Sequence, residues 1–329
     1  MILAGDIGGT KTLLAIFDGE KTVFKQHFDS ANYNTFQELL TNFLSLCVFA
    51  GDELTFTSVC LGVAGPIMNG DCETTNLPWK LKCDEISKQL KTENVILIND
   101  LEAAAWGILS LPKSDFVSLN SNAEVQIGNC AILAAGTGLG EAIVFYDGAK
   151  HHVIANEGGH TDFAPTDAQQ IALLSFMQTR YPEHVSYERL VSGVGIEAIF
   201  DFLRHTQYPE ISPELETRLQ NANDKAAAIS LFAMENGDEL CRAAMQLFAK
   251  IYGAEAGNLA LKCLSYGGVY LAGGIAAKCL PFLQQGTFLE GFLAKGRYRG
   301  ALEKMPINVC MQPEVGLLGA LHFGKLQKL

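Results

Sequence analysis

The sequence has few charged residues and no surplus of basic ones, and these shortages exclude several classes of protein. Charged residues make up 18% of the 329 residues and hydrophobic residues 48%, too apolar a composition for a disordered chain. There are 24 lysines and arginines against 36 aspartates and glutamates, a formal charge of −12, which argues against a nucleic-acid partner. An anionic ligand remains possible, because backbone amides and metal ions bind anions locally.

The sequence also lacks any Cys-x-x-Cys pair, and its cysteine count of nine is odd. Several of the cysteines lie inside apolar runs, as in Val59-Cys60-Leu61. This pattern predicts scattered buried thiols in a reducing compartment rather than disulfides or a zinc site. The cysteines are Cys47, Cys60, Cys72, Cys83, Cys130, Cys241, Cys263, Cys279 and Cys310.

Long apolar runs are missing as well. No run approaches the roughly 20 residues that span a bilayer, so we expect no membrane association. The first residues carry no basic segment and break at Gly5-Asp6 after three apolar residues, which is not the pattern of a signal peptide. We therefore expect a soluble, cytoplasmic protein.

The length exceeds what one compact core usually supports, so two domains are expected. Residues 2–17 form two apolar runs around a glycine-rich turn, the pattern of a β-hairpin, and residues 130–145 repeat this design. Two such hairpins, one early in each half, indicate a duplicated domain plan. Strands and helices alternate in both halves, so the fold class is α/β.

Other segments are assigned by their periodicity and turn residues. Strands are expected at residues 22–28, 59–63, 95–98 and 269–272, and helices at 35–50, 101–111 and 316–326. Residues 226–264 are expected to be helical with a break near 235–238, and the polar residues 206–225 to be a surface excursion.

Three glycine-rich loops are candidate nucleotide-binding elements. In Asp6-Ile7-Gly8-Gly9-Thr10, glycines permit positive φ and close backbone approach, successive amides can hold phosphate oxygens, and Asp6 can hold Mg²⁺ directly or through water. Alone, this segment equally fits an ordinary hairpin turn.

The second loop, Gly136-Thr137-Gly138-Leu139-Gly140, resembles a dinucleotide fingerprint, but that fingerprint requires a helix after the turn and the following residues predict a strand. The third loop contains Gly273-Gly274, where a strand runs into a helix and backbone can lie against an adenine or ribose. A helix start that needs small residues explains this loop equally well.

Asn99-Asp100-Leu101-Glu102 follows a buried-type strand. Asn99 suits an N-cap and Glu102 the third helical position, a capping-box pattern, and this segment alone favours the structural interpretation. Asp100 would then lie at the carboxyl end of a strand, where α/β proteins place ligand-binding residues. A cap and a catalytic base are compatible here.

Glu157-Gly158-Gly159-His160 combines polar groups with two glycines that make a helix improbable, so we expect a turn that presents Glu157 and His160 to a polar ligand. A surface loop is the alternative. Glu188 is by default a solvated helix residue, and His151-His152 receives no role.

Together, the motifs DIGGT, AGTGLG, LAGGI, the IND segment and EGGHTDFAP followed by SYERLVSG resemble bacterial glucokinases of the sugar-kinase/actin/Hsp70 superfamily, over essentially the whole chain. Related repressor–kinases carry a cysteine-rich zinc motif after the His segment. Residues 164–167 contain no cysteine, so the resemblance is to the zinc-free branch. Lys11 stands where some members have asparagine.

The resemblance implies a two-lobed actin-like ATPase (ribonuclease H-like) fold with a cleft between the lobes. The small lobe would be residues 1–98, completed by a helix at 313–329, and the large lobe residues 99–312. It also implies that Thr75-Asn76-Leu77-Pro78-Trp79 covers the sugar. A homodimer is expected, because closed dimers are common among soluble proteins.

The resemblance further implies ATP-dependent phosphorylation of glucose. Asp100 would be the general base on the 6-hydroxyl, and the first two glycine loops would hold the ATP phosphates. The implied sugar ligands are Asn99, Asp100, Glu157, His160 and Glu188. The implied nucleotide and Mg²⁺ ligands are Asp6, Gly8, Gly9, Thr10, Gly136, Thr137, Gly138, Gly273 and Gly274.

Three alternatives stay open at this point. The first is a kinase for another hexose, because pocket details decide which sugar is accepted. The second is a non-catalytic sugar sensor on the same fold, which would tolerate the loss of Asp100 or of a phosphate loop. The third is an actin- or Hsp70-like ATPase, for which the sugar cluster would have no purpose.

Overall fold

The computed structural model describes residues 1–47, 54–74, 77–208, 210–235 and 237–327. The chain divides into two compact units: unit 1 comprises Met1–Lys113 and Gln312–Leu329, and unit 2 comprises Ser114–Met311. This division lies 15 residues beyond the lobe boundary expected after residue 98. The first helix after that point packs within unit 1, as described below.

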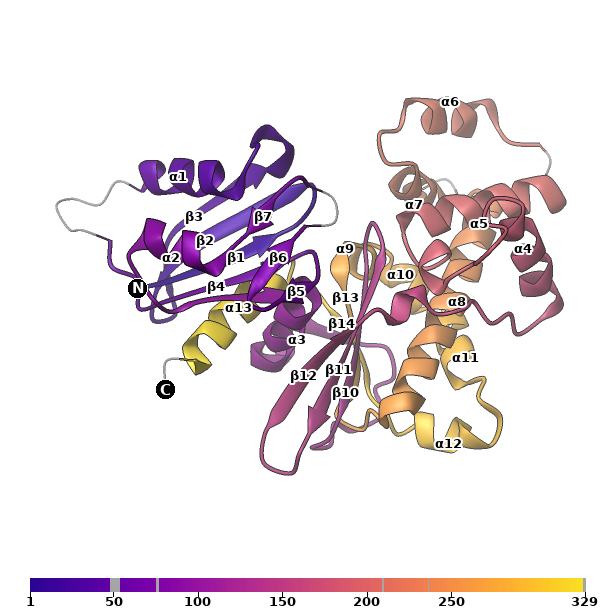
Figure 1. Ribbon diagram of the computed structural model, residues 1–329. Helices are drawn as coiled ribbons and strands as arrows, with labels where there is room; N and C mark the ends of the chain where they lie inside the picture. Colours follow the sequence, from indigo (N-terminus) through magenta and orange to yellow (C-terminus); the bar gives the residue numbers. More distant parts are fainter. Residues whose placement is uncertain (48–53, 75–76, 209, 236, 328–329) are drawn as a thin grey trace. The chain divides into compact units, whose positions relative to one another are not determined.

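Unit 1 is built on a five-stranded sheet in the order β3-β2-β1-β4-β8, which Figure 1 shows in indigo and purple. The three antiparallel strands are β1 (Ile2–Ile7), β2 (Lys11–Asp18) and β3 (Lys21–Asp29). β4 (Ser58–Val63) runs parallel to β1, and β8 (Val95–Asn99) parallel to β4. A small second sheet contains β5 (Ile67–Met68), β6 (Asp71–Glu73) and β7 (Lys80–Leu81).

Helices cover both faces of this sheet because β1 alternates its apolar side chains between them. Leu3 and Ile7 pack with α1 (Phe36–Leu46) and α2 (Cys83–Leu90). Ile2 and Ala4 pack with α3 (Asp100–Ser110) and α13 (Val315–Leu326). Side chains two residues apart on a strand share a face, so Asp6 lies on the same face of the sheet as Ile2 and Ala4, the face that α13 covers. Two short 3₁₀-helices, η1 (Ser30–Asn32) and η2 (Lys113–Asp115), are the remaining helices in the first 115 residues that the structure describes.

The crossing of α3 and α13 depends on two glycines. A Cβ atom at Gly319 would lie 1.7 Å from the Ala103 carbonyl oxygen, and one at Gly107 would lie 2.1 Å from the Val315 carbonyl oxygen. Backbone therefore meets backbone at this crossing, which places α3 firmly in unit 1 rather than in the unit that follows it in sequence.

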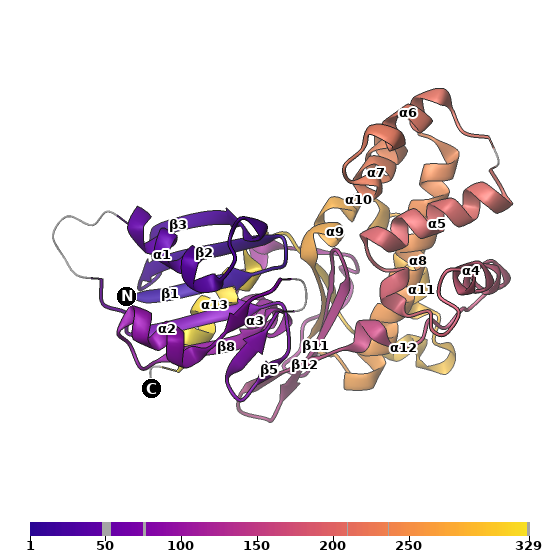
Figure 2. The ribbon, with the colours of Figure 1, turned by 45° about the horizontal axis from the view of Figure 1, so that its top comes forward.

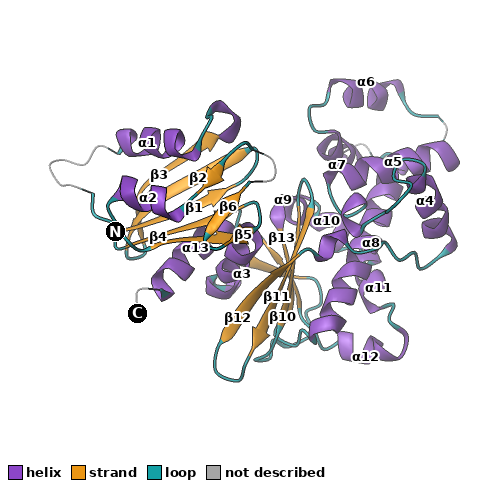
Figure 3. Ribbon diagram, in the orientation of Figure 1, coloured by secondary structure: helices purple, strands orange, loops and turns teal. Residues whose placement is uncertain are grey.

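Unit 2 contains a six-stranded sheet in the order β12-β11-β10-β13-β14-β9. β10 (Cys130–Ala135), β11 (Leu139–Tyr146) and β12 (His151–Asn156) are antiparallel, and β13 (Gly268–Ala272) and β14 (Ile307–Cys310) add in parallel beside β10. β9 (Phe116–Ser118) closes the edge antiparallel to β14. Without β9 this is the strand order of unit 1, so the predicted duplication is confirmed; both sheets are drawn in orange in Figure 3.

The core of unit 2 lies between the sheet and α8 (Glu239–Cys263), around which Figure 2 shows α5, α7 and α11. The preceding helices are η3 (Gly158–His160), α4 (Ala168–Gln178), η4 (Tyr187–Arg189), α5 (Gly193–Thr206), α6 (Pro213–Asn221) and α7 (Lys225–Glu235). The following ones are α9 (Gly273–Lys278), α10 (Leu280–Leu283), α11 (Thr287–Leu293), η5 (Gly296–Tyr298) and α12 (Arg299–Leu302).

The expected strands and helices are present, with two refinements. The helix expected at 35–50 is α1, which ends at Leu46, and residues 48–50 lie outside the described residues. The polar stretch 206–225 contains α6, which Ser212 caps and Pro213 begins, and whose Leu215 is fully buried. The expected helix break separates α7 from α8, although residue 236 lies outside the described residues. None of the nine cysteines, all of which lie within the described residues, forms a disulfide. Within the described ranges, no helix is long and apolar enough to cross a membrane.

Candidate functional site

The first glycine loop, between β1 and β2, is held in place from below by Ser30. Gly8 donates its N–H to the Lys11 carbonyl at 2.9 Å, which closes the hairpin turn. Buried Ser30 donates its N–H to the Thr10 carbonyl at 3.0 Å and its hydroxyl to the Gly8 carbonyl at 2.9 Å. These bonds fix the carbonyl groups of the loop within unit 1, so the loop has one backbone conformation to offer a ligand.

Asp6 lies just before this loop, half-buried beside Asp100. Burial and, to a smaller extent, the charge of Asp100 raise the pKa of Asp6 to about 6. A Cβ atom at Gly316 would lie 2.8 Å from Asp6 Oδ2, so the carboxylate rests against the first turn of α13. A helix N-terminus is a favourable place for a negative charge.

Asp100 is the first residue of α3 and follows the last residue of β8. Leu101 donates its N–H to Asn99 Oδ1 and to Asp100 Oδ1, each at 2.9 Å. Asn99 Nδ2 donates to the Gly65 carbonyl at 3.3 Å, and the Glu102 carboxylate accepts the Asn99 N–H. The predicted capping box is therefore confirmed, and it positions Asp100 at the end of the strand.

The donor set around Asp6 and Asp100 suits Mg²⁺. Both groups are carboxylates, and the charge of one raises the pKa of the other, a repulsion that a divalent cation between them would relieve. In the described part of the chain, no three His, Cys, Asp or Glu residues form a metal-binding group. Mg²⁺ characteristically takes one or two protein carboxylates and completes its shell with water and phosphate oxygens.

The second glycine loop joins β10 to β11 in unit 2. Gly136 donates its N–H to the Gly138 carbonyl at 2.8 Å, and Gly193, the first residue of α5, donates to the Gly136 carbonyl at 3.0 Å. Thr137 is exposed, and a Cβ atom at Gly136 would meet nothing within 4 Å. Because the loop exits into a strand, the dinucleotide fingerprint is excluded, as the sequence predicted.

Glu188 connects this loop to the Glu157–His160 turn. Its Oε2 accepts the Leu139 N–H at 3.0 Å and would lie 2.3 Å from a Cβ atom at Gly138. Its Oε1 lies 3.9 Å from His160 Nδ1, and His160 Nε2 lies 4.0 Å from Glu157 Oε2. The default interpretation of Glu188 as a solvated helix residue was wrong, because its carboxylate is tied to the backbone of the second loop.

The turn that carries Glu157 and His160 is the 3₁₀-helix η3, in agreement with the prediction that its glycines prevent an α-helix. Both side chains are well exposed, at 85% and 59%. A Cβ atom at Gly159 would lie 2.0 Å from the Leu139 carbonyl oxygen, so the turn packs directly on the second loop. Glu157, His160 and Glu188 therefore lie together in unit 2.

The third glycine loop lies beside the second. Gly273 has φ +82°, and a Cβ atom there would lie 2.4 Å from the Ala135 carbonyl oxygen, so both backbone conformation and space require glycine. Gly274 is exposed and faces open space. Since β10 and β13 are parallel neighbours, the two loops meet at the carboxyl end of the sheet, where α/β proteins bind ligands.

Known proteins match this chain over nearly its full length. The family model described as Glucokinase matches residues 3–327. A glucokinase from Synechocystis sp. is 40% identical, covering 97% of this chain and 96% of its own. This chain belongs to the glucokinase family.

Solved structures agree with this assignment. The crystal structure of a glucokinase from an Antarctic psychrotroph matches with a TM-score of 0.83 and 28% identity, covering 99% of this chain and 98% of that one. A ROK family glucokinase from Streptomyces griseus, in complex with glucose and AMPPNP, has a TM-score of 0.66 at 18% identity and covers 99% of both chains. The latter likeness shows the fold, which is the actin-like ATPase fold of sugar kinases.

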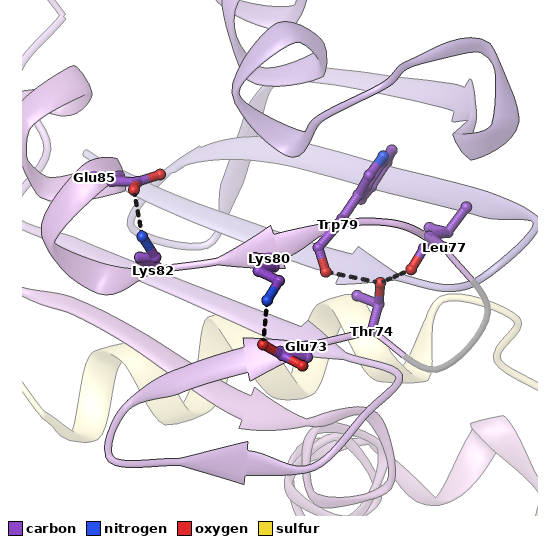
Figure 4. A network of polar contacts seen from close by, with 7 residues as sticks. All are labelled: Glu73, Thr74, Leu77, Trp79, Lys80, Lys82 and Glu85. Carbon is purple, nitrogen blue, oxygen red and sulfur yellow. Dashed lines mark hydrogen bonds and ion pairs between the residues drawn. The ribbon is translucent and has the colours of Figure 1, made fainter.

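The small sheet of unit 1 carries the segment that resembled the sugar-covering part of the glucokinase family. Thr75 and Asn76 lie outside the described residues, but the flanking residues form the polar network in Figure 4. Thr74 donates its hydroxyl to the carbonyls of Leu77 at 2.8 Å and Trp79 at 3.1 Å. Buried Trp79 donates its indole N–H to the Tyr33 carbonyl at 3.0 Å, which anchors the segment to the rest of unit 1.

Sequence reasoning missed three buried polar residues of this glucokinase-family chain: Ser30 beneath the first loop, and Glu141 and Glu255 beneath the second. The two glutamates left a signal in the sequence. Each is a carboxylic acid inside an otherwise apolar stretch, a position that is rarely filled by an ionisable residue unless it has a specific partner.

Proposed function

We propose that this protein transfers the γ-phosphoryl group of ATP to the 6-hydroxyl of glucose and so forms glucose 6-phosphate, the first step of glycolysis. The observation that carries this proposal is the position of Glu188. The Glu188 carboxylate contacts His160, which belongs to a cluster suited to sugar hydroxyls. The same carboxylate contacts the Gly136–Gly140 loop, which is suited to phosphates. A single site that joins these two groups is what a sugar kinase requires.

The sugar is bound, in this proposal, by Asn99, Glu157, His160 and Glu188 together with Asp100. A neutral polyol offers hydroxyl donors and acceptors, and these residues supply carboxylate, amide and imidazole partners for them. The Glu157 and His160 side chains are exposed enough in unit 2 to accept a ligand. The side-chain amide of Asn99 already bonds the Leu101 N–H and the Gly65 carbonyl. Asn99 would therefore bind the sugar while it also caps α3.

The nucleotide is bound by the glycine loops. Gly8, Gly9 and Thr10 in unit 1 and Gly136, Thr137 and Gly138 in unit 2 would hold the phosphates, and Gly273-Gly274 would lie against the adenosine. Asp6 would hold Mg²⁺ through water. When bound, Mg²⁺ neutralises charge that develops on the transferring phosphoryl group.

Asp100 is proposed as the general base that accepts the proton of the 6-hydroxyl. Its carboxylate stands at the end of β8, held by the capped start of α3, so it needs little reorganisation on binding. Phosphoryl transfer depends on positioning and charge neutralisation, and a positioned base adds a further rate factor.

The test replaces this base. In Asp100→Asn, kcat should fall by about 10²–10⁴-fold, while the Kd for glucose measured by calorimetry changes much less. Asp84→Asn, the same change at an exposed position in α2, should retain wild-type kcat. A kcat for Asp100→Asn near that of the wild type would remove Asp100 from this role. Absence of glucose-dependent ADP release by the wild type would refute the proposed activity itself.

We also propose that the protein is a cytoplasmic homodimer. Nine cysteines without a disulfide suit a reducing compartment, and two-fold dimers are the commonest assemblies of soluble proteins.

A further inference from the structure

Two carboxylic acids meet in the core of unit 2. Glu141 on β11 and Glu255 on α8 are both fully buried, and their side chains are within hydrogen-bonding reach of each other. When both are ionised they can only accept hydrogen bonds. Among the described residues, both oxygens of Glu141 and Oε1 of Glu255 then have no donor. One proton held between the two acids turns this contact between acceptors into a hydrogen bond.

The charged surroundings agree with a retained proton. Burial raises the pKa of both acids, and for Glu141 the charge of Glu255 raises it further. The nearby cations oppose this rise: Lys262 of α8 acts on both acids and Lys295, after α11, acts on Glu255. Their effect is smaller than that of burial.

Other titratable groups also face the pair. Tyr252 and Cys263 of α8 lie near Glu141, and Tyr187 of η4 lies near Glu255. Burial raises the pKa of each of these three, so they are neutral at physiological pH and cannot compensate a second negative charge.

The pair also touches both turns of the candidate sugar cluster. A Cβ atom at Gly158 would lie 2.0 Å from Glu141 Oε2, so η3 rests on the Glu141 carboxyl group. On the other side, Asn258 Nδ2 donates to Glu255 Oε2 at 2.8 Å and to the Tyr187 hydroxyl at 3.0 Å. Tyr187 directly precedes Glu188 in η4.

We propose that Glu141 and Glu255 form a proton-sharing positioning pair, which sets the spacing of η3 and η4 and thereby places Glu157, His160 and Glu188 for the sugar. The inference rests on the proposed function, because those three residues are its sugar ligands. If the shared proton is lost at alkaline pH, two like charges stand beneath Gly158 without a donor between them. The turn then moves, and glucose affinity falls while the machinery for phosphoryl transfer stays in place.

The first measurement does not depend on catalysis. At neutral pH the infrared spectrum of the wild type should contain the C=O stretch of a buried protonated carboxyl group. Glu141→Gln should lose this band, because the new amide donates to Glu255 and allows it to ionise. Glu183→Gln, the same change at an exposed site in unit 2, should retain the band. If Glu141→Gln does not fold, Glu255→Gln makes the same test from the other side.

The second measurement is the pH dependence of glucose affinity. The glucose KM of the wild type should rise at alkaline pH, with little change in kcat at saturating glucose. Glu141→Gln should have a nearly flat KM profile and a neutral-pH KM close to that of the wild type. Glu141→Ala, which removes the support of Gly158, should lower kcat/KM for glucose by about 10²-fold at all pH values.

The outcomes separate the two proposals. A wild type without the infrared band, or a Glu141→Gln variant with the same KM profile as the wild type, overturns the positioning pair and leaves glucose phosphorylation intact. Stabilisation of the wild type by K⁺ or Na⁺ in the absence of the band would show that the acids hold a cation instead. A band with no glucose-dependent turnover would retain the proton-sharing pair but refute the proposed function and the sugar role built on it.

Discussion

The crossing of α3 and α13 predicts that one added methyl group will destabilise the protein. Glycine to alanine in a helix interior ordinarily stabilises by about 0.5–1 kcal/mol. In Gly319→Ala, however, the new Cβ would lie 1.7 Å from the Ala103 carbonyl oxygen and 2.5 Å from the Gly107 nitrogen. Both are backbone atoms that cannot rotate away, so the helices must separate by roughly 1 Å or more. Leu317 and Leu321 would then lose contact with the sheet.

Overpacking of a well-packed core costs about 1–3 kcal/mol, and the lost contacts bring the expected destabilisation to about 3 kcal/mol. An unfolding entropy of about 2.1 cal/mol/K per residue converts this into a change in melting temperature. Tm should fall by about 11 °C if unit 1 melts alone, or by about 4 °C if the whole chain melts together. The size of the shift therefore also reports whether the two units unfold cooperatively.

Differential scanning calorimetry measures the shift in Tm and shows whether the two units unfold together. Gly300→Ala is the matched control, because Gly300 lies in α12 and a Cβ there would meet nothing within 4 Å. That variant should be as stable as the wild type or slightly more so. A Gly319→Ala protein with an unchanged or raised Tm would refute the close backbone contact on which the reasoning depends.

Two further predictions concern the candidate site. Gly138→Ala should displace Glu188 from the Leu139 N–H and raise the glucose KM about 10- to 100-fold. Gly300→Ala, in open space in α12 and outside the proposed site, should leave the glucose KM unchanged, and equal steady-state KM values for the two variants would contradict the Glu188 contact. The pKa of Asp6 in the folded protein is about 6, above its ordinary value of 3.8. Folding therefore takes up protons between pH 3.8 and 6, and above this range the ionised carboxylate of Asp6 destabilises the fold. In Mg²⁺-free urea denaturation, Asp6→Asn should therefore gain stability over the wild type as pH rises from 4 to 7, and a difference independent of pH would be evidence against the burial of Asp6.

Much of the fold could be predicted because its signals are local. The two hairpins, the cap at Asn99 and the break before α8 each depend on residues within a few positions of one another. The glycine pair of η3 likewise excluded an α-helix by its own backbone preferences. These features needed no knowledge of how distant segments pack.

The parts that could not be predicted depend on distant partners. Ser30 bonds a loop 20 residues earlier in the chain, and Glu141 meets Glu255 across the core. Glu188 looked solvated because nothing near it in sequence shows that Leu139 donates to it. The resemblance placed the helix at 313–329 with the small lobe, but the position of α3 in the same unit was hidden, because its contact with α13 joins segments far apart in the sequence.

The return of α13 to unit 1 has a consequence for synthesis on the ribosome. β1 and β2 are translated long before Leu317, Ala320 and Leu321, which cover one face of their sheet. Unit 2 intervenes with 198 residues, Ser114–Met311, which take about 10–40 s to translate. For that time the apolar face of the sheet that α13 covers stays open to water, and a chaperone that shields it would be most needed before α13 is synthesised.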